Sequence, residues 1–152
     1  MKTSELTGDA LVCAVAMCEG YTDLHKIPDR WPHEPQWAMM PPNREYGVME
    51  LWEIGSAYDW GFCGPIIERE RIQITPDVGC WNAHYHDNLF EEDGSDCFQI
   101  GKTPLIAAMR CYVASKLGDE IELPEELMTA TFWNDTHRCE KREEVEIPDE
   151  LK

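Results

Sequence analysis

The chain has 152 residues, of which 43% are hydrophobic and six are tryptophan, which is enough apolar surface for one folded domain and argues against wholesale disorder. Its 30 acidic and 13 basic side chains give a net charge of −17, which disfavours direct binding to nucleic acid or to anionic membranes and permits attraction to basic protein surfaces. Seven cysteines without a Cys-x-x-Cys pair indicate reduced thiols, and we expect a cytoplasmic protein.

The first predicted element is a helix over residues 8–18. Leu11 and Val15 recur at helical spacing behind Thr7, a residue type that caps helix N-termini. Gly20 follows, and glycine commonly ends helices in the left-handed conformation. We therefore expect a short, half-buried helix that ends before residue 20.

The stretch from about 23 to 47 is predicted to be one long loop. It holds five of the ten prolines, each of which fixes its own backbone angle and keeps the preceding residue out of the helical region. Trp31 and Trp37 lie inside it. Either these rings form a lid over a binding site, or the stretch is an insertion that packs over the core, which is the interpretation we favour.

Short elements follow in the middle of the chain. Residues 48–54 alternate imperfectly and fit either a strand or a short helix. The Gly-Pro pair at 64–65 is typical of a helix start, with proline at the first helical position. Residues 71–75 and 80–86 alternate as strands on either side of a Pro- and Gly-containing turn, which predicts an antiparallel hairpin.

The clearest element is a helix over residues 104–117. Thr103 is a good N-cap, Pro104 stands at the first helical position, and Gly118 follows the last turn. An acidic stretch at 88–96 precedes this helix and is expected to be a surface loop.

Together these elements predict an α+β fold in a single domain over residues 1–133. A small antiparallel sheet is packed by the two main helices at about 8–18 and 104–117, and the long Pro- and Trp-rich loop at about 23–47 is an insertion. Residues 134–152 are rich in charge and poor in core residues, which predicts an acidic, mobile tail.

The Gly-Lys-Thr at 101–103 invites comparison with a phosphate-binding P-loop, but its surroundings exclude that motif. Six residues separate it from Gly94, where a P-loop has about four. The position of the required glycine holds Asp96, and Pro104 has no N–H to donate to a phosphate. We therefore interpret the motif as a helix start, whose N–H groups can still attract an anion.

One set of metal-ligand types shares a strand face. Period two places Cys80, His84 and His86 together, as a zinc site requires. Trp81 and Ala83 on the opposite face are the expected buried side, which leaves the histidines solvated. We therefore predict no metal and no cofactor, and these three residues are the candidates that would hold one.

The segment around residues 58–71 combines aromatic rings with positive charge. Tyr58 and Trp60 supply rings, and Arg69 and Arg71 supply guanidinium groups, which suits a stacked anion such as a nucleotide. In the alternative interpretation, which we favour for this segment on its own, Trp60 fills the core and Arg69 pairs with carboxylates.

Four segments of the chain carry a resemblance to a known family. They read MKTSELTGDAL, YDWGFCGPIIERERI, WNA at 81–83, and GKTPLIAAMRCYVASKLGDEIELPEEL. These segments resemble the NinX family of small accessory proteins of tailed phages and prophages, with apparent insertions at about 23–47 and 87–97. The resemblance implies a phage-encoded protein that acts in the bacterial cytoplasm, and it supplies no catalytic residues.

Two classes of function fit these observations. In the first, which we favour, the protein is a non-enzymatic binder that sequesters a small nucleotide-like ligand, such as a host defence signal, in a pocket within one chain or between two copies. In the second, its acidic surface binds and inhibits a basic host protein, for example as a mimic of nucleic acid. A hydrolase that degrades the signal ranks third. The candidate ligand residues are Tyr58, Trp60, Arg69, Arg71, Thr103, Arg110, Trp31 and Trp37.

Overall fold

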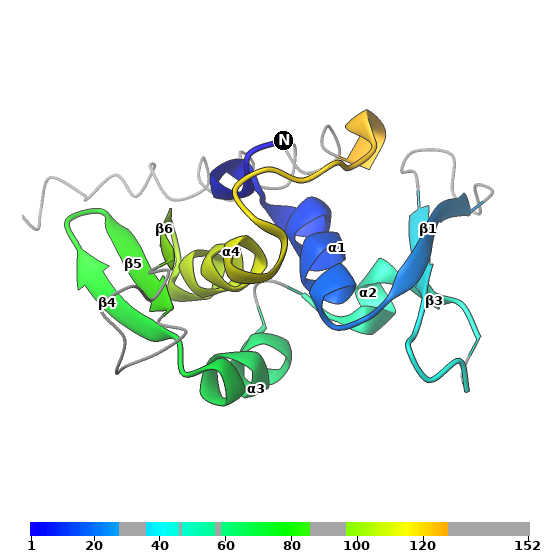
Figure 1. Ribbon diagram of the computed structural model, residues 1–152, viewed down its shortest axis with the longest axis horizontal. Helices are drawn as coiled ribbons and strands as arrows, with labels where there is room; N and C mark the ends of the chain where they lie inside the picture. Colours follow the sequence, from blue (N-terminus) through cyan, green and yellow to red (C-terminus); the bar gives the residue numbers. More distant parts are fainter. Residues whose placement is uncertain (28–35, 46, 57–58, 86–96, 128–152) are drawn as a thin grey trace, which may run out of the picture.

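The computed structural model describes residues 1–27, 36–45, 47–56, 59–85 and 97–127 (Figure 1). The fold is α+β, as predicted. In chain order its elements are η1 (Thr3–Glu5), α1 (Gly8–Cys18), β1 (Thr22–Ile27), β2 (Gln36–Met40), β3 (Met49–Glu50), α2 (Leu51–Ile54), α3 (Trp60–Glu70), β4 (Gln73–Asp77), β5 (Cys80–Tyr85), β6 (Cys97–Gly101) and α4 (Pro104–Leu117). Helices α1 and α4 lie between two small antiparallel sheets.

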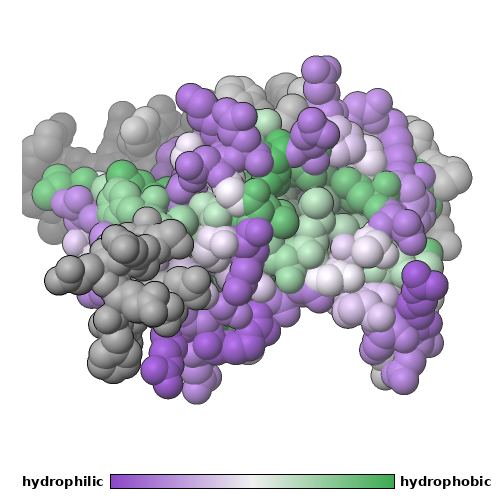
Figure 2. All heavy atoms as spheres, in the orientation of Figure 1, coloured by the Kyte–Doolittle hydropathy of each residue, from purple (hydrophilic) through white to green (hydrophobic). Residues whose placement is uncertain are grey.

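Helix α1 confirms the predicted bounds 8–18, but it is more than half-buried: residues 10–16 are all buried and belong to the core. After the last turn, the N–H of Gly20 donates to the carbonyl of Met17 (3.2 Å), with Gly20 in the left-handed region at φ +91°. Thr7 occupies the N-cap position, but its side chain makes no capping hydrogen bond. Seen from the side shown in Figure 2, apolar residues lie in the middle of the molecule, over α1, and hydrophilic residues surround them.

Helix α4 confirms the prediction for residues 104–117. The side chain of Thr103 accepts a hydrogen bond from the N–H of Ile106 (3.2 Å), and Pro104 stands in the first turn. The helix packs against β5 and β6, and it also contacts α1 and α3 (Figure 1). Because neighbours cover it on several sides, α4 is buried along most of its length.

Strands β4 and β5 form the predicted hairpin, with Ile74 opposite Ala83 and the turn glycine, Gly79, at φ +73°. Strand β6 pairs with β5 and completes the sheet in the order β4-β5-β6, so β6 is an edge strand. This strand is not among the predicted elements, because it adjoins an acidic stretch whose composition is typical of a loop.

The prediction of one long loop over about 23–47 is wrong, because that stretch contains β2 and nearly all of β1, which belong to a second sheet in the order β1-β2-β3. In its antiparallel pairs Lys26 lies opposite Trp37, and Ala38 lies opposite Glu50. The prolines stand outside the strands, so their number does not prevent pairing. Trp37 is 9% exposed and belongs to the core, so its ring packs over the core and does not form a lid. Trp31 lies outside the described residues.

The predicted start of the middle helix, at the Gly-Pro pair 64–65, is wrong. Helix α3 begins at Trp60, because the side chain of Asp59 accepts a hydrogen bond from the N–H of Gly61 (2.8 Å) and so caps an earlier turn. The proline at 65 therefore lies inside the helix.

Two neighbouring boundaries also differ from the sequence pattern. Arg71 ends α3 in the left-handed conformation, at φ +53°, so β4 begins at Gln73 and not at residue 71. Residues 48–54 contain both predicted alternatives, since the two-residue strand β3 leads directly into α2. That sequence pattern has no clean face because the backbone changes conformation within it.

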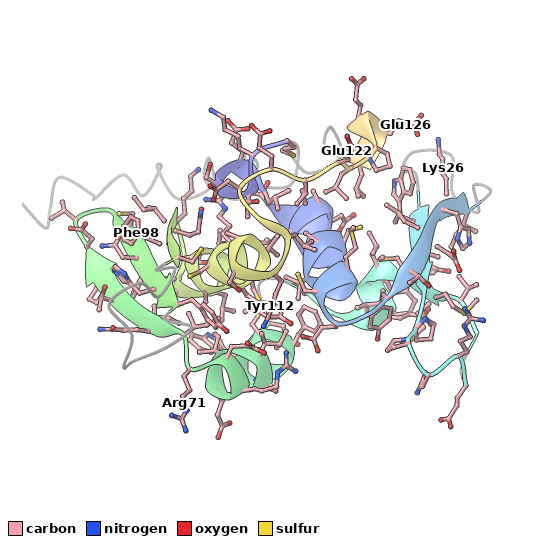
Figure 3. All side chains as sticks on the ribbon, in the orientation of Figure 1. Lys26, Arg71, Phe98, Tyr112, Glu122 and Glu126 are labelled. Carbon is pink, nitrogen blue, oxygen red and sulfur yellow. The ribbon has the colours of Figure 1, made fainter. Side chains whose placement is uncertain are left out.

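The segment that follows α4 is hydrogen-bonded to the N-terminus. The amino group of Met1 donates to the carbonyl of Ile121 (2.9 Å), whose own N–H donates to the carbonyl of Met1 (2.9 Å). Farther along, Leu127 is fully buried, and Lys26 on β1 lies 3.0 Å from Glu126 (Figure 3). The fold thus extends at least to residue 127, whereas the predicted boundary at 133 and the acidic tail lie outside the described residues.

No helix in the described part of the chain combines the length and the apolar character that a membrane span requires.

Candidate functional site

Arg69 belongs to a network of five charged and polar side chains, which we call the Arg69 network. The terminal nitrogens of Arg69 donate to both carboxylate oxygens of Glu19 (3.2 and 2.5 Å), and the Nε of Arg69 donates to Glu70 (2.9 Å). The hydroxyl of Tyr112 donates to Glu19 (2.7 Å), and Lys116 lies 3.3 Å from Glu70. The network joins the end of α1 to α3 and α4.

The proton affinities in the Arg69 network follow from these contacts. The hydrogen bond from Arg69 holds the pKa of Glu19 below its usual value. Burial alone would raise the pKa of Glu70, but hydrogen bonds from Arg69 and Lys116 lower it on balance. Burial raises the pKa of Tyr112, and the neighbouring Glu19 raises it further. Arg69 therefore pairs with carboxylates, as the alternative interpretation predicts.

The other candidate ligand residues of the middle segment and the helix start do not gather around Arg69. Arg71 is exposed and extends away from the body of the protein (Figure 3). Trp60 is 57% exposed at the start of α3, so the prediction that it fills the core is wrong. Thr103 caps α4. Tyr58, like Trp31, lies outside the described residues.

Arg110 lies on a different side of α4. It is two residues from Tyr112, which places the two side chains about 200° apart around the helix. The Nε of Arg110 donates to the carbonyl of Leu6 (2.8 Å), and one terminal nitrogen donates to the carbonyl of Ile100 (2.9 Å). The guanidinium group is thereby fixed between η1 and the edge strand β6. Since Arg69 contacts Tyr112, the two arginines do not share one site.

A groove of about 470 Å³ lies beside Arg110, along β6. We call it the Arg110 groove. Two of the side chains that line it, Lys102 and Arg110, are positively charged, and no carboxylate is among its described lining residues. Its lining comprises Ser4, Cys80, Phe98, Gln99, Ile100, Gly101, Lys102 and Arg110. The chain as a whole has a net charge of −17, so a groove lined by positive side chains differs in charge from the rest of the molecule.

Two apolar side chains of β6 form part of the groove. Phe98 and Ile100 are each 46% exposed, and period two places them on the same face of the strand. The ring of Phe98 contacts the ring of His84, with centroids 4.8 Å apart. Figure 3 shows Phe98 at the sheet, well separated from Tyr112 between α4 and α3. The groove therefore pairs aromatic and aliphatic surface with positive charge.

The Gly-Lys-Thr motif builds the connection from β6 to α4. A Cβ atom at Gly101 would lie 2.4 Å from the backbone nitrogen of Ala107, so only glycine lets the strand approach the helix this closely. Thr103 then caps the helix, and Lys102 between them lines the groove. The interpretation of the motif as a helix start is confirmed.

The candidate metal ligands are only partly described. Cys80 and His84 lie on the predicted strand, and His84 packs against Phe98, whereas His86 lies outside the described residues. In the ranges that the structure describes, no three histidine, cysteine or acidic side chains converge as metal ligands would.

Sequence reasoning identified Arg110 but missed most of the groove around it. Ser4, Phe98, Gln99 and Ile100 carry no motif. Lys102 lies inside a motif that lacks the features of a P-loop and that we interpret only as a helix start. The available signal was the alternation of Phe98 and Ile100 directly before Gly-Lys-Thr, which is typical of a strand that leads into a helix.

A family model described as Bacteriophage P22, NinX matches residues 2–116. The chain belongs to this family. It is therefore a phage accessory protein, as the sequence resemblance implies. All residues that line the Arg110 groove fall within the range matched by the NinX family model. None of the curated proteins with which the chain was compared matches it.

Proposed function

We propose that this NinX-family protein captures a small anionic, nucleotide-like ligand in the Arg110 groove and holds it without catalysis. The observation that carries the proposal is the pair of cations, Lys102 and Arg110, beside exposed apolar side chains in a groove whose described lining has no carboxylate. The surrounding net charge of −17 repels anions at long range, so a site for one needs a local positive field of this kind.

The two cations of the groove, Arg110 and Lys102, would contribute to anion binding in different ways. Two backbone carbonyls fix the guanidinium group of Arg110, so it loses little conformational freedom when a ligand binds. Lys102 is exposed and carries a compact charge on a flexible stem, which can follow a phosphate group. Phe98 offers a ring on which a planar base can stack.

Capture without turnover fits the types of side chain present. No histidine, aspartate or glutamate is among the described residues that line the groove, so none of these supplies a general base there. A phage protein that sequesters a host signalling nucleotide would need affinity and no chemistry. We therefore place sequestration ahead of hydrolysis.

The test is a thermal-shift screen with cyclic nucleotides and ADP-ribose. A ligand that binds only the folded state stabilises it by about 2.7 kcal/mol at a hundred times its Kd, which appears as a rise in Tm. Lys102→Gln should abolish most of this rise. The control is Arg71→Gln, which removes one exposed positive charge outside the groove and should preserve the rise.

Two results would count against capture in the groove. If no nucleotide raises Tm, and a basic host protein binds the chain in a salt-sensitive way, the acidic surface is the functional one. If a nucleotide raises Tm equally in Lys102→Gln and Arg71→Gln, the ligand binds elsewhere. Loss of the intact nucleotide over time would show catalysis.

A further inference from the structure

Two cysteines lie side by side where β6 packs against α4. The thiol of Cys97 lies 3.5 Å from the carbonyl oxygen of Cys111, and the thiol of Cys111 lies 3.2 Å from the carbonyl oxygen of Cys97. Both are free thiols in this structure. In these reciprocal contacts each thiol touches the backbone of the other residue, so the two cysteines are direct neighbours, which is the first requirement for a disulfide.

The pair lies directly behind the Arg110 groove. Cys97 precedes Phe98 on β6, and Cys111 follows Arg110 on α4, so each thiol is one residue from a residue that lines the groove. We infer that Cys97 and Cys111 form a redox latch: a disulfide between them joins β6 to α4 and stiffens the wall of the groove.

The two thiols differ in access, which sets the order of the reaction. Cys97 is half-buried and Cys111 is buried. The thiolate of Cys97 attacks a small-molecule disulfide, such as oxidised glutathione, and forms a mixed disulfide while one glutathione thiolate leaves and takes up a proton. Cys111 then loses its proton to solvent and attacks the sulfur of Cys97, which releases the second glutathione. One small disulfide is reduced to two thiols, and the two cysteines are oxidised to one disulfide.

The latch is expected to close slowly. Burial raises the pKa of both thiols, and the negative charge of Asp119 adds to the effect at Cys97. The attacking thiolate is therefore scarce at neutral pH, and oxidation takes minutes to hours rather than seconds. A cytoplasm rich in reduced glutathione keeps the latch open, and an oxidising shift closes it.

The test is to incubate the full-length folded protein with oxidised glutathione, then measure its intact mass and map its peptides without reduction. The wild type should lose about 2 Da and yield one cross-linked peptide pair, Cys97 with Cys111. Cys111→Ala should instead retain one glutathione on Cys97. Cys80→Ser, which removes another half-buried thiol of the same sheet, should still form the cross-link.

A second measurement asks whether the bond fits the native packing. Closing a loop of about 15 residues should raise Tm by about 5–10 °C. It should also slow hydrogen exchange at the amides of β6. The inference is overturned if the wild type accumulates only glutathione adducts, if the cross-link joins other cysteines, if it forms only in denaturant, or if it lowers Tm.

Discussion

The Arg69 network and the Arg110 groove lie on opposite sides of α4, and each is centred on an arginine. Arg69 is matched by the carboxylates of Glu19 and Glu70, so its charge is used within the fold. Arg110 donates to two backbone carbonyls, which orient its guanidinium group beside the Arg110 groove. The comparison shows that the position of an arginine, relative to carboxylates and to a groove, decides which role it is a candidate for.

The largest expected loss of stability comes from a substitution on the side of α4 that faces the Arg110 groove. Gly101→Val should reduce the free energy of unfolding by about 3 kcal/mol or more, because the new side chain would collide with the backbone of Ala107. The midpoint of denaturant unfolding measures this loss. The matched control is Gly64→Ala in α3, where the added methyl group meets no neighbour and should stabilise the helix by up to about 1 kcal/mol. Equal midpoints for the two variants would refute the close approach of β6 to α4.

On the network side, Arg69→Gln should cost about 1–2 kcal/mol of unfolding free energy. It leaves Glu19 and Glu70, whose side chains are 26% and 14% exposed, without their shared cation. The loss stays below that of a fully buried ion pair because half of the Arg69 side chain is exposed. Arg71→Gln, also on an exposed arginine, should change stability by less than about 0.5 kcal/mol. A similar small effect at both positions would show that the network contributes little to the fold.

The network should also give the protein a specific response to acid. The pKa values of Glu19 and Glu70 are lower in the folded state than the ordinary value of 4.5. Their contribution to stability is therefore complete above that pH and is lost as the pH falls through the lowered values. The difference in unfolding free energy between wild type and Arg69→Gln should narrow below about pH 4.5. A difference that stays constant from pH 7 to pH 3 would contradict this assignment.

The helices and the hairpin were predictable because their signals are local. Caps and apolar periodicity mark residues 8–18 and 104–117, and a turn separates two alternating runs in the hairpin. The sheet β1-β2-β3 was not, because the prolines around its strands give the stretch the composition of a loop. Strand β6 was missed because it follows an acidic stretch whose composition is typical of a loop.

The candidate site was predictable only in part, since its arginines contact residues that are far away in the sequence. Arg69 meets Glu19 across 50 positions, and Arg110 meets Leu6 across 104. No spacing rule connects residues so far apart, so the sequence could not show which arginine pairs with Glu19. The sequence marks Arg110 as a candidate by its charge alone. It marks Lys102 only as part of a motif that does not fit a P-loop.

The central claim is that the Arg110 groove, and not the Arg69 network, holds an anion. The most direct measurement is a titration of the folded protein with ADP-ribose and with cyclic nucleotides, followed by backbone amide chemical shifts. We predict saturable shifts that cluster at Ser4 and Phe98–Lys102 in wild type and disappear in Lys102→Gln. Shifts that cluster instead around Glu19 and Glu70, or none with any of these nucleotides, would contradict the claim.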